Sequence, residues 1–156
     1  MDDFTVVIDT REQLPWEFGL HTTAKKKLDT GDYSIEGLEH LLCIERKRSV
    51  SEVATNISEK RFKNVLERMS QIQYRFILLE FDLEDIYTFP VGSDIPKKLW
   101  EHLKISSKYI LKYITEIQLN YGVNILFCGC SENAEKMAVS IMKRVYEKHG
   151  NKQNDI

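Results

Sequence analysis

The sequence is poor in several residues that mark special classes of protein. It has three prolines and seven glycines among 156 residues, too few for a linker or a low-complexity tract. Three cysteines are an odd number, which favours free thiols in a reducing compartment over a disulfide framework. Neither sign of charge dominates, because 22 Lys and Arg stand against 24 Asp and Glu. That balance excludes a strongly basic nucleic-acid coat protein, a polyacidic tail protein and a simple membrane-surface binder.

Long hydrophobic runs are also missing. The longest uncharged stretch, residues 117–131, is 15 residues long and contains three Asn or Gln side chains, which is too short for a membrane-spanning helix. The chain begins Met1-Asp2-Asp3, which is acidic where a signal peptide is basic. We therefore expect no membrane partner and no secretion.

Short apolar runs predict five strands. They cover residues 4–9, 33–35, 41–44, 76–81 and 123–128, and their β-branched and aromatic residues suit a sheet. The run FILLEF at 76–81 is apolar on both faces, which is typical of a central buried strand.

Capping and spacing signals predict three helices. The first begins at a capping box formed by Ser49 and Glu52 and continues to Met69. The second runs from Pro96 to Gly122. The third is capped by Ser131 and carries an apolar stripe, Ala134, Met137, Ala138, Ile141 and Val145.

This order of strands and helices predicts a three-layer α/β domain with a central mixed β-sheet flanked by helices. The length corresponds to one domain. We assign residues 1–150 to this domain and residues 151–156 to a frayed polar tail.

Acidic residues stand at the ends of the predicted strands. Asp9 closes the first strand, Asp32 opens the second, and Glu45 ends the third. Lys47 lies two residues beyond Glu45 and so shares its face of the strand. A turn at Gly37 brings Asp32 to the end where Glu45 emerges. Two carboxylates and an ammonium are therefore expected to meet at one edge of the sheet.

An Asp…Glu-x-Lys set suits the hydrolysis of phosphodiesters. Such hydrolysis uses a divalent cation that polarises a phosphoryl oxygen and lowers the pKa of a bound water. Mg²⁺ takes oxygen ligands and keeps several waters, so one or two carboxylates suffice. A neighbouring lysine can orient the attacking water or stabilise the developing charge. We expect Mg²⁺ as the cofactor and no small-molecule cofactor.

Three runs around these residues resemble the successive motifs of XPF-type nuclease domains. Residues 6–12 (VVIDTRE) contain V-x-D-x-R-E, residues 31–33 match G-D-Y, and residues 45–47 match E-R-K. The run FILLEFD at 76–82 also resembles the buried strand of that family. The resemblance extends in the family's order from Val6 to about Tyr146. It implies a restriction-endonuclease-like (PD-(D/E)xK) fold and metal-dependent cleavage of DNA.

The resemblance also implies a role for each site residue. Asp32 and Glu45 would bind Mg²⁺ or Mn²⁺ together with the backbone carbonyl of Arg46, and Lys47 would act on the water or the phosphate. Two further acidic residues would assist the metal or hold nearby basic side chains: Asp9 and Glu12.

The chain departs from the family pattern at two places. The E-R-K motif continues x-x-x-D in the family, but Ser51 stands at that position and Glu52 follows it. Glu52 is therefore both a helix-capping residue and a candidate replacement acid. On the helix after the motif the family tends to have R-x-x-x-Q; here Arg61 matches and Val65 replaces the glutamine.

Basic residues are segregated along the chain. Residues 45–68 contain seven Lys or Arg and four Glu, whereas residues 80–94 contain five acidic residues and no Lys or Arg. One side of the domain is therefore expected to face phosphates. The candidate DNA contacts are Arg11, Arg46, Arg48, Arg61, Lys25, Lys26 and Lys27. For the lysine run, a solvated loop is an equal alternative; for Trp16, we expect core packing, with stacking on a base as the alternative.

We predict a metal-dependent DNA endonuclease of XPF type that acts on branched, flapped or otherwise structured DNA in repair or recombination. The resemblance also implies a homodimer or heterodimer formed through the nuclease domain, and we expect a cytoplasmic or nucleoid-associated location. Only six residues follow Gly150, so DNA binding is expected from the domain's own basic surface or from a partner. One alternative is a catalytically silent DNA- or protein-binding module that pairs with an active nuclease subunit. Another is a nicking or recombination nuclease of the same fold that acts on plain duplex.

Overall fold

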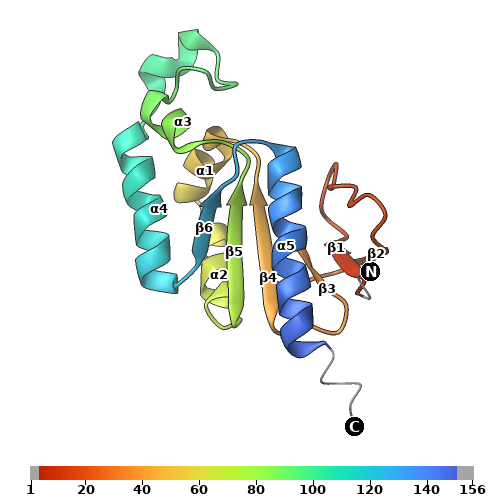
Figure 1. Cartoon of the computed structure of the whole chain (residues 1–156). Helices are drawn as coiled ribbons and strands as arrows, with labels where there is room; N and C mark the ends of the chain where they lie inside the picture. Colours follow the sequence, from red (N-terminus) through yellow and green to blue (C-terminus); the bar gives the residue numbers. More distant parts are fainter. Residues whose placement is uncertain (1–3, 151–156) are drawn as a thin grey trace.

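A six-stranded mixed sheet forms the centre of the computed structural model, which describes residues 4–150 (Figure 1). The strands follow the order β2-β1-β3-β4-β5-β6. β1 is parallel to β2 and antiparallel to β3, β3 is antiparallel to β4, and β4, β5 and β6 are parallel. The strands are β1 (Val6–Asp9), β2 (Thr23–Lys26), β3 (Tyr33–Ile35), β4 (Leu42–Lys47), β5 (Tyr74–Leu79) and β6 (Asn124–Phe127).

Helices cover both faces of this sheet. The helical segments are α1 (Val50–Ile57), α2 (Lys60–Met69), α3 (Leu83–Thr88), the 3₁₀ helix η1 (Lys97–His102), α4 (Ser107–Tyr121) and α5 (Ser131–His149). α1, α2 and α4 lie on one face and α5 lies on the other, while α3 and η1 belong to an excursion that projects beyond the sheet (Figure 1). Each face has its own cluster of buried side chains. The predicted three-layer α/β fold is confirmed.

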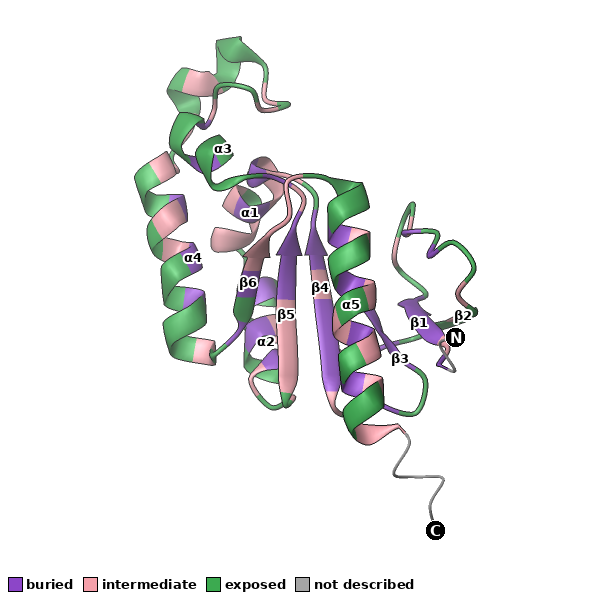
Figure 2. Ribbon diagram, viewed as in Figure 1, coloured by how far each residue is buried: buried purple, intermediate pink, exposed green. Residues whose placement is uncertain are grey.

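The alternation of side chains along β4 decides which motif residues share a face. Cys43 packs into the cluster under α1, α2 and α4, whereas Ile44 packs into the cluster under α5. Figure 2 shows that β4 is buried along most of its length. Because successive side chains of a strand point to opposite faces, Glu45 and Lys47 lie on the α1–α2 face and Arg46 lies on the α5 face.

Two of the three predicted helices are each divided. The helix that begins after Ser49 is capped at Ser58, and α2 begins after Glu59, whose extended backbone (φ −96°, ψ 120°) interrupts the helix. The predicted helix from Pro96 is a short 3₁₀ helix, and α4 begins only after Ser106. The spacing of apolar residues marks the buried face of each segment, but it does not show that the backbone turns between them.

Some element ends also differ from the prediction. β2 is missing from the predicted strands because its residues are polar and mostly exposed. The Cys130 sulfur caps α5 by accepting a backbone N–H at 3.5 Å, and Ser131 is the first helical residue instead of the cap. Met137, expected in the apolar stripe, is 41% exposed, and Met142 is buried instead.

The described residues also bear on the membrane and cysteine predictions. Between residues 4 and 150, each helix is too short or too polar to span a lipid bilayer. All three cysteines are free thiols, and Cys43 is buried. The acidic start and the tail at 151–156, which we predicted to be frayed, lie outside the described residues.

Candidate active site

Asp32 is fixed at the edge of the sheet by hydrogen bonds to two neighbouring strands. It follows Gly31, whose φ of +87° suits glycine and turns the chain into β3. The Asp32 N–H donates to the Ile44 carbonyl at 2.9 Å, and the Asp32 carbonyl accepts the Asp9 N–H at 2.9 Å. Its Oδ2 accepts the backbone N–H of Arg46 at 2.8 Å. The structure thus brings the ends of β1, β3 and β4 together.

Lys47 and Glu45 lie side by side on the α1–α2 face of β4. The Lys47 Nζ atom is 3.4 Å from Glu45 Oε1 and 3.6 Å from Glu52 Oε1. It also lies 4.3 Å from the ring centroid of Phe62 on α2, a cation–π contact. Only 7% of the Lys47 side chain is exposed. Two carboxylates and an aromatic face therefore hold this ammonium in place.

A cavity of about 190 Å³ lies beside these residues. Its lining includes five acidic residues and three arginines: Asp9, Glu12, Asp29, Asp32, Glu45, Arg11, Arg61 and Arg68. The two arginines from α2 are exposed. Acidic groups surrounded by arginines suit a site where a cation and a phosphate meet.

Burial and mutual repulsion raise the pKa values of the two central carboxyls. The pKa of Asp32 lies well above its ordinary value because the group is buried and because Glu45 repels its charge. Burial also raises the pKa of Glu45; Lys47 opposes this shift, while Glu52 and Glu12 add to it. A cation bound between these carboxylates would relieve the repulsion.

Glu12 supplies a third carboxylate with one unused oxygen. Its Oε1 lies 3.2 Å from Nη2 of Arg48, and the side chain is 10% exposed. Its Oε2 is buried and has no hydrogen-bond partner within residues 4–150, and the Tyr33 hydroxyl lies near the same carboxylate. Buried polar atoms normally have a partner. An orphaned carboxylate oxygen in the same cavity as Asp32 and Glu45 is therefore consistent with a bound cation.

The donor atoms at this edge fit a hard divalent cation. They are all oxygens, the ligand type that Mg²⁺ takes. The N–H and C=O of a strand residue point to the same side, so the Arg46 carbonyl faces the Asp32 side of β4. No group of three or more His, Cys, Asp or Glu side chains within the described part of the chain is arranged as a complete metal site. Mg²⁺ keeps several waters and needs only one or two carboxylates, so Asp32 and Glu45 suffice.

Asp9 has a structural role at the edge of the cavity. Its carboxylate accepts hydrogen bonds from Arg11 Nε at 2.9 Å and from the Leu28 N–H at 2.8 Å. Burial raises its pKa, but these hydrogen bonds outweigh burial, and the pKa lies below its ordinary value. Of the two roles expected for Asp9, assisting a metal or holding a basic side chain, the structure shows that it holds Arg11.

The Arg46 side chain lies on the opposite face of the sheet. Its guanidinium donates to both Glu80 carboxylate oxygens, at 2.8 and 3.3 Å, and to the Leu14 carbonyl at 3.0 Å. It also lies over the Trp16 ring, 4.8 Å from the centroid. The residue is 8% exposed. The expected DNA contact by this side chain is wrong, because strand alternation turns it away from Lys47 and into the core under α5.

The same network anchors the loop between β1 and β2. Trp16 stacks on Tyr33 with ring centroids 4.5 Å apart, and its Nε1 donates to Glu80 at 2.8 Å. Only 4% of Trp16 is exposed, so it is a packing residue and is not free to stack on a base. Glu80 is not among the predicted site residues; its only signal in the sequence is an acid placed at the end of an apolar strand.

The remaining arginines differ in what they contact. Arg61 lines the cavity from α2, and so does Arg68, which donates to Thr30 Oγ1 at 3.1 Å. Arg68 is not among the predicted contacts, although its spacing of two helical turns from Arg61 places both on one face. Arg48 binds Glu12 and loop carbonyls, so it helps to hold the β1–β2 loop.

The three lysines of the run at 25–27 lie on or directly after β2, the outermost strand of the sheet. Lys25 and Lys26 belong to β2, and Lys26 Nζ lies 2.5 Å from Glu36 Oε1. All three, Lys27 included, are exposed. None of them lines the acidic cavity among the described residues, so the structure assigns them to the surface beside the site.

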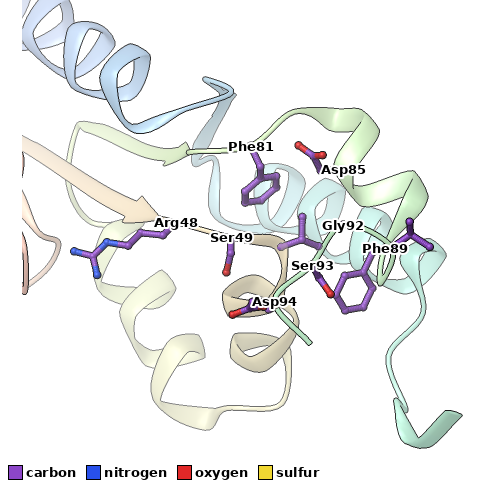
Figure 3. A pocket seen from close by; sticks show the side chains of 11 residues that line it. Arg48, Ser49, Phe81, Asp85, Phe89, Gly92, Ser93 and Asp94 are labelled. Carbon is purple, nitrogen blue, oxygen red and sulfur yellow. Dashed lines mark hydrogen bonds between the residues drawn. The ribbon is translucent and has the colours of Figure 1, made fainter. Parts of the chain in front are cut away.

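Ser51, which stands where the family has an aspartate, meets an acid from elsewhere in the chain. Its Oγ donates to Asp94 Oδ1 at 2.6 Å. Both residues line a second cavity of about 290 Å³, between the start of α1 and the segment that includes Phe89 and Ser93 (Figure 3). A carboxylate is therefore present beside position 51, although it comes from the excursion after β5.

Glu52, the candidate replacement acid, points to Lys47. Ser49 Oγ accepts the Glu52 N–H at 3.1 Å, which is one of the two bonds of the predicted capping box. The Glu52 carboxylate accepts the Arg48 N–H at 3.3 Å and lies 3.6 Å from Lys47. These contacts make Glu52 a partner of the lysine.

A mixed sheet that gathers two partly buried carboxylates and a buried lysine at one edge defines a restriction-endonuclease-like nuclease domain of the XPF type. The chain belongs to the ERCC4 domain family, whose profile matches residues 8–141.

Solved structures with the same fold include XPF from Aeropyrum pernix, with a TM-score of 0.65 and 16% identity over 97% of this chain and 69% of that chain. Aeropyrum pernix XPF in complex with DNA gives a TM-score of 0.63 and 17% identity over 93% of this chain and 66% of that chain. No curated protein sequence matches the chain.

Proposed function

We propose that this chain is a metal-dependent endodeoxyribonuclease that acts on branched, flapped or otherwise structured DNA. The observation that carries the proposal is the meeting of Asp32, Glu45 and Lys47 on one side of the sheet, beside a cavity lined by arginines. Membership of the ERCC4 domain family supports the same class of reaction.

The metal would be held by oxygen atoms at the edge of the sheet. Asp32, Glu45 and the Arg46 carbonyl would be its ligands, and the unpaired Oε2 of Glu12 would be a further acceptor for the ion or its waters. When bound, Mg²⁺ or Mn²⁺ would polarise a phosphoryl oxygen and lower the pKa of a bound water.

Lys47 would act on the phosphate through its ammonium. Its alkyl chain is packed and its ammonium lies beside Glu45 and Phe62, so the protein confines this charge to the side of the sheet where the phosphate would bind. It would stabilise negative charge on the phosphate or orient the attacking water. The water oxygen bonds to phosphorus as the bond between phosphorus and the 3′ oxygen breaks, which leaves a 5′-phosphate and a 3′-hydroxyl.

DNA would lie against the arginines of the cavity. Arg61 and Arg68 extend from α2 and Arg11 from the loop after β1, while the buried Arg46 makes no contact. The solved complex of Aeropyrum pernix XPF with DNA supports this class of ligand. Pairing with a second nuclease domain stays a prediction.

A cleavage assay with matched variants tests the proposal. End-labelled flap, fork, single-stranded and duplex DNA are incubated with the protein and Mg²⁺, Mn²⁺ or EDTA. We expect cleavage of branched DNA that needs the metal and that falls by about 100-fold or more in Glu45→Gln and Lys47→Met. Glu36→Gln, which alters only an exposed acid paired with Lys26, is the control and retains activity.

Two other outcomes would replace the proposal. DNA binding without cleavage, unaffected by Glu45→Gln and Lys47→Met, would favour the silent binding module. Cleavage of plain duplex in preference to flaps and forks would favour a nicking or recombination nuclease of the same fold.

A further inference from the structure

The buried ammonium of Lys47 shares its nearest partner with the proposed metal. Its Nζ lies 3.4 Å from Glu45 and 3.6 Å from Glu52. If a carboxylate oxygen of Glu45 coordinates a cation, that oxygen is no longer fully available as a hydrogen-bond acceptor for Lys47. An ammonium has three donors, and a buried charge with too few acceptors is destabilised. A further acceptor near Lys47 is therefore needed in the metal-bound state.

Asn56 offers an unused acceptor on the same helix as Glu52. It follows Glu52 by four residues on α1, so the two side chains share one face. Its Oδ1 is buried and has no hydrogen-bond partner within residues 4–150. Such an orphaned amide oxygen is rare and destabilising.

Asn56 and Lys47 line the same small void in the core. Its volume is about 10 Å³, and its other lining residues are apolar, with Val53, Phe62 and Ile114 among them. Lys47 and Asn56 are the only polar residues in this lining within the described part of the chain. Asn56 is therefore the polar neighbour that shares this apolar region of the core with Lys47.

We propose that Asn56 is a positioning residue whose Oδ1 accepts a hydrogen bond from Lys47 when the metal engages Glu45. Because an ammonium only donates, the amide must present Oδ1, which is the buried atom. Glu52 and Asn56 together then hold Lys47 from α1, while Phe62 covers it from α2. The inference rests on the proposed function of Glu45 as a metal ligand.

Thermal unfolding without metal or DNA distinguishes an Asn56 Oδ1 that has no partner from one that accepts a hydrogen bond from Lys47. In the wild-type background, Asn56→Leu is expected to raise Tm by about 2–4 °C, because it removes an orphaned oxygen. In the Glu45→Gln background, the same substitution lowers Tm by about as much, because Oδ1 then serves Lys47. Adding Lys47→Met to Glu45→Gln makes Asn56→Leu stabilising again.

The exposed Asn64 on α2 provides the matched control. Asn64→Leu is expected to shift Tm equally in all three backgrounds. If Asn56→Leu also gives one sign and size of shift in every background, Asn56 does not serve Lys47 and the proposal fails.

Cleavage kinetics give a second readout. Asn56→Leu is expected to lower kcat about tenfold and leave KM unchanged, and Asn56→Asp restores kcat because a carboxylate also accepts the hydrogen bond. A change in KM alone, or no rescue by Asn56→Asp, overturns the positioning role. An inactive wild-type protein rejects the proposed nuclease function, whereas the dependence of Tm on background still decides whether Asn56 serves Lys47.

Discussion

The Asp32 carboxylate accepts the backbone N–H of Arg46 across 2.8 Å, and this bond joins motifs that lie 14 residues apart. It holds the start of β3 against the end of β4. Glu45 and Lys47 project from that end of β4 on the α1–α2 face. Only Oδ2 of Asp32 takes part in a hydrogen bond within residues 4–150, which leaves Oδ1 for a ligand. One carboxylate thus serves both the backbone and the proposed metal.

Asp32→Asn is expected to stabilise the metal-free protein by about 1 kcal/mol at pH 7. The raised pKa of Asp32 means that the folded state binds its proton more tightly than the unfolded chain. Stability from this group is therefore full below about pH 4, the unfolded pKa, and is lost as pH rises through the folded pKa. Urea unfolding from pH 3.5 to 8, in EDTA, should show a difference between the two proteins that grows with pH.

The same two proteins report on metal binding. Adding Mn²⁺ at neutral pH should raise Tm of the wild type, because an ion that binds only the folded state stabilises it. Asp32→Asn should respond weakly. Equal responses to Mn²⁺ would contradict the assignment of Asp32 as a ligand, and a stability difference that does not change with pH would contradict its raised pKa.

Gly31→Ala is expected to destabilise the protein far more than Gly37→Ala. Both glycines have a φ near +86°, so the backbone strain is similar and costs about 1 kcal/mol. A Cβ on Gly31 would lie 2.5 Å from Cys43 Sγ and 3.2 Å from the Ile44 carbonyl, whereas a Cβ on Gly37 meets nothing within 4 Å. Overpacking should add about 1–3 kcal/mol at Gly31. Chemical denaturation measures the free energy of unfolding of both variants. Equal losses of stability would show that the close approach of Gly31 to Cys43 and Ile44 is unimportant.

Glu80→Gln is expected to lower the free energy of unfolding by about 3–5 kcal/mol, because it leaves the buried charge of Arg46 without its partner. Both side chains of this pair are 7% exposed. Glu36→Gln breaks the exposed pair with Lys26 and should change stability little. Urea titration of the wild type and the two variants makes the comparison. A Glu80→Gln protein as stable as the wild type would show that the Arg46–Glu80 pair does not stabilise the fold.

Arg61→Ala and Arg68→Ala are expected to weaken DNA binding about equally for all sequences. Each lost phosphate contact should also reduce the slope of log affinity against log salt by about 1. Lys136, exposed on α5 and paired with Glu132, provides the control substitution Lys136→Ala. Fluorescence anisotropy in EDTA, with labelled DNA at several salt concentrations, gives the slopes. A larger effect from Lys136→Ala would place the DNA on the other face.

The motif residues were predictable because their positions depend on local rules. Period-two alternation places Glu45 and Lys47 together, and a glycine before Asp32 predicts a tight entry into the next strand. The position of Arg46 on the α5 face follows from the same alternation. Its partner Glu80, however, lies 34 residues away, directly after β5. No local pattern links those two residues, because α1 and α2 separate β4 from β5 in the chain.

The sequence by itself determined the class of fold, the strand ends that carry acidic residues and the face shared by Glu45 and Lys47, because periodicity and spacing act within a single element. Only the tertiary structure decided which groups meet. It buried Arg46 on the α5 face, paired Asp9 with Arg11, placed Glu52 near Lys47 and brought Asn56 and Lys47 to the lining of one void. Those contacts depend on how strands and helices distant in the chain pack together, and packing of that kind leaves no periodic signal in the sequence.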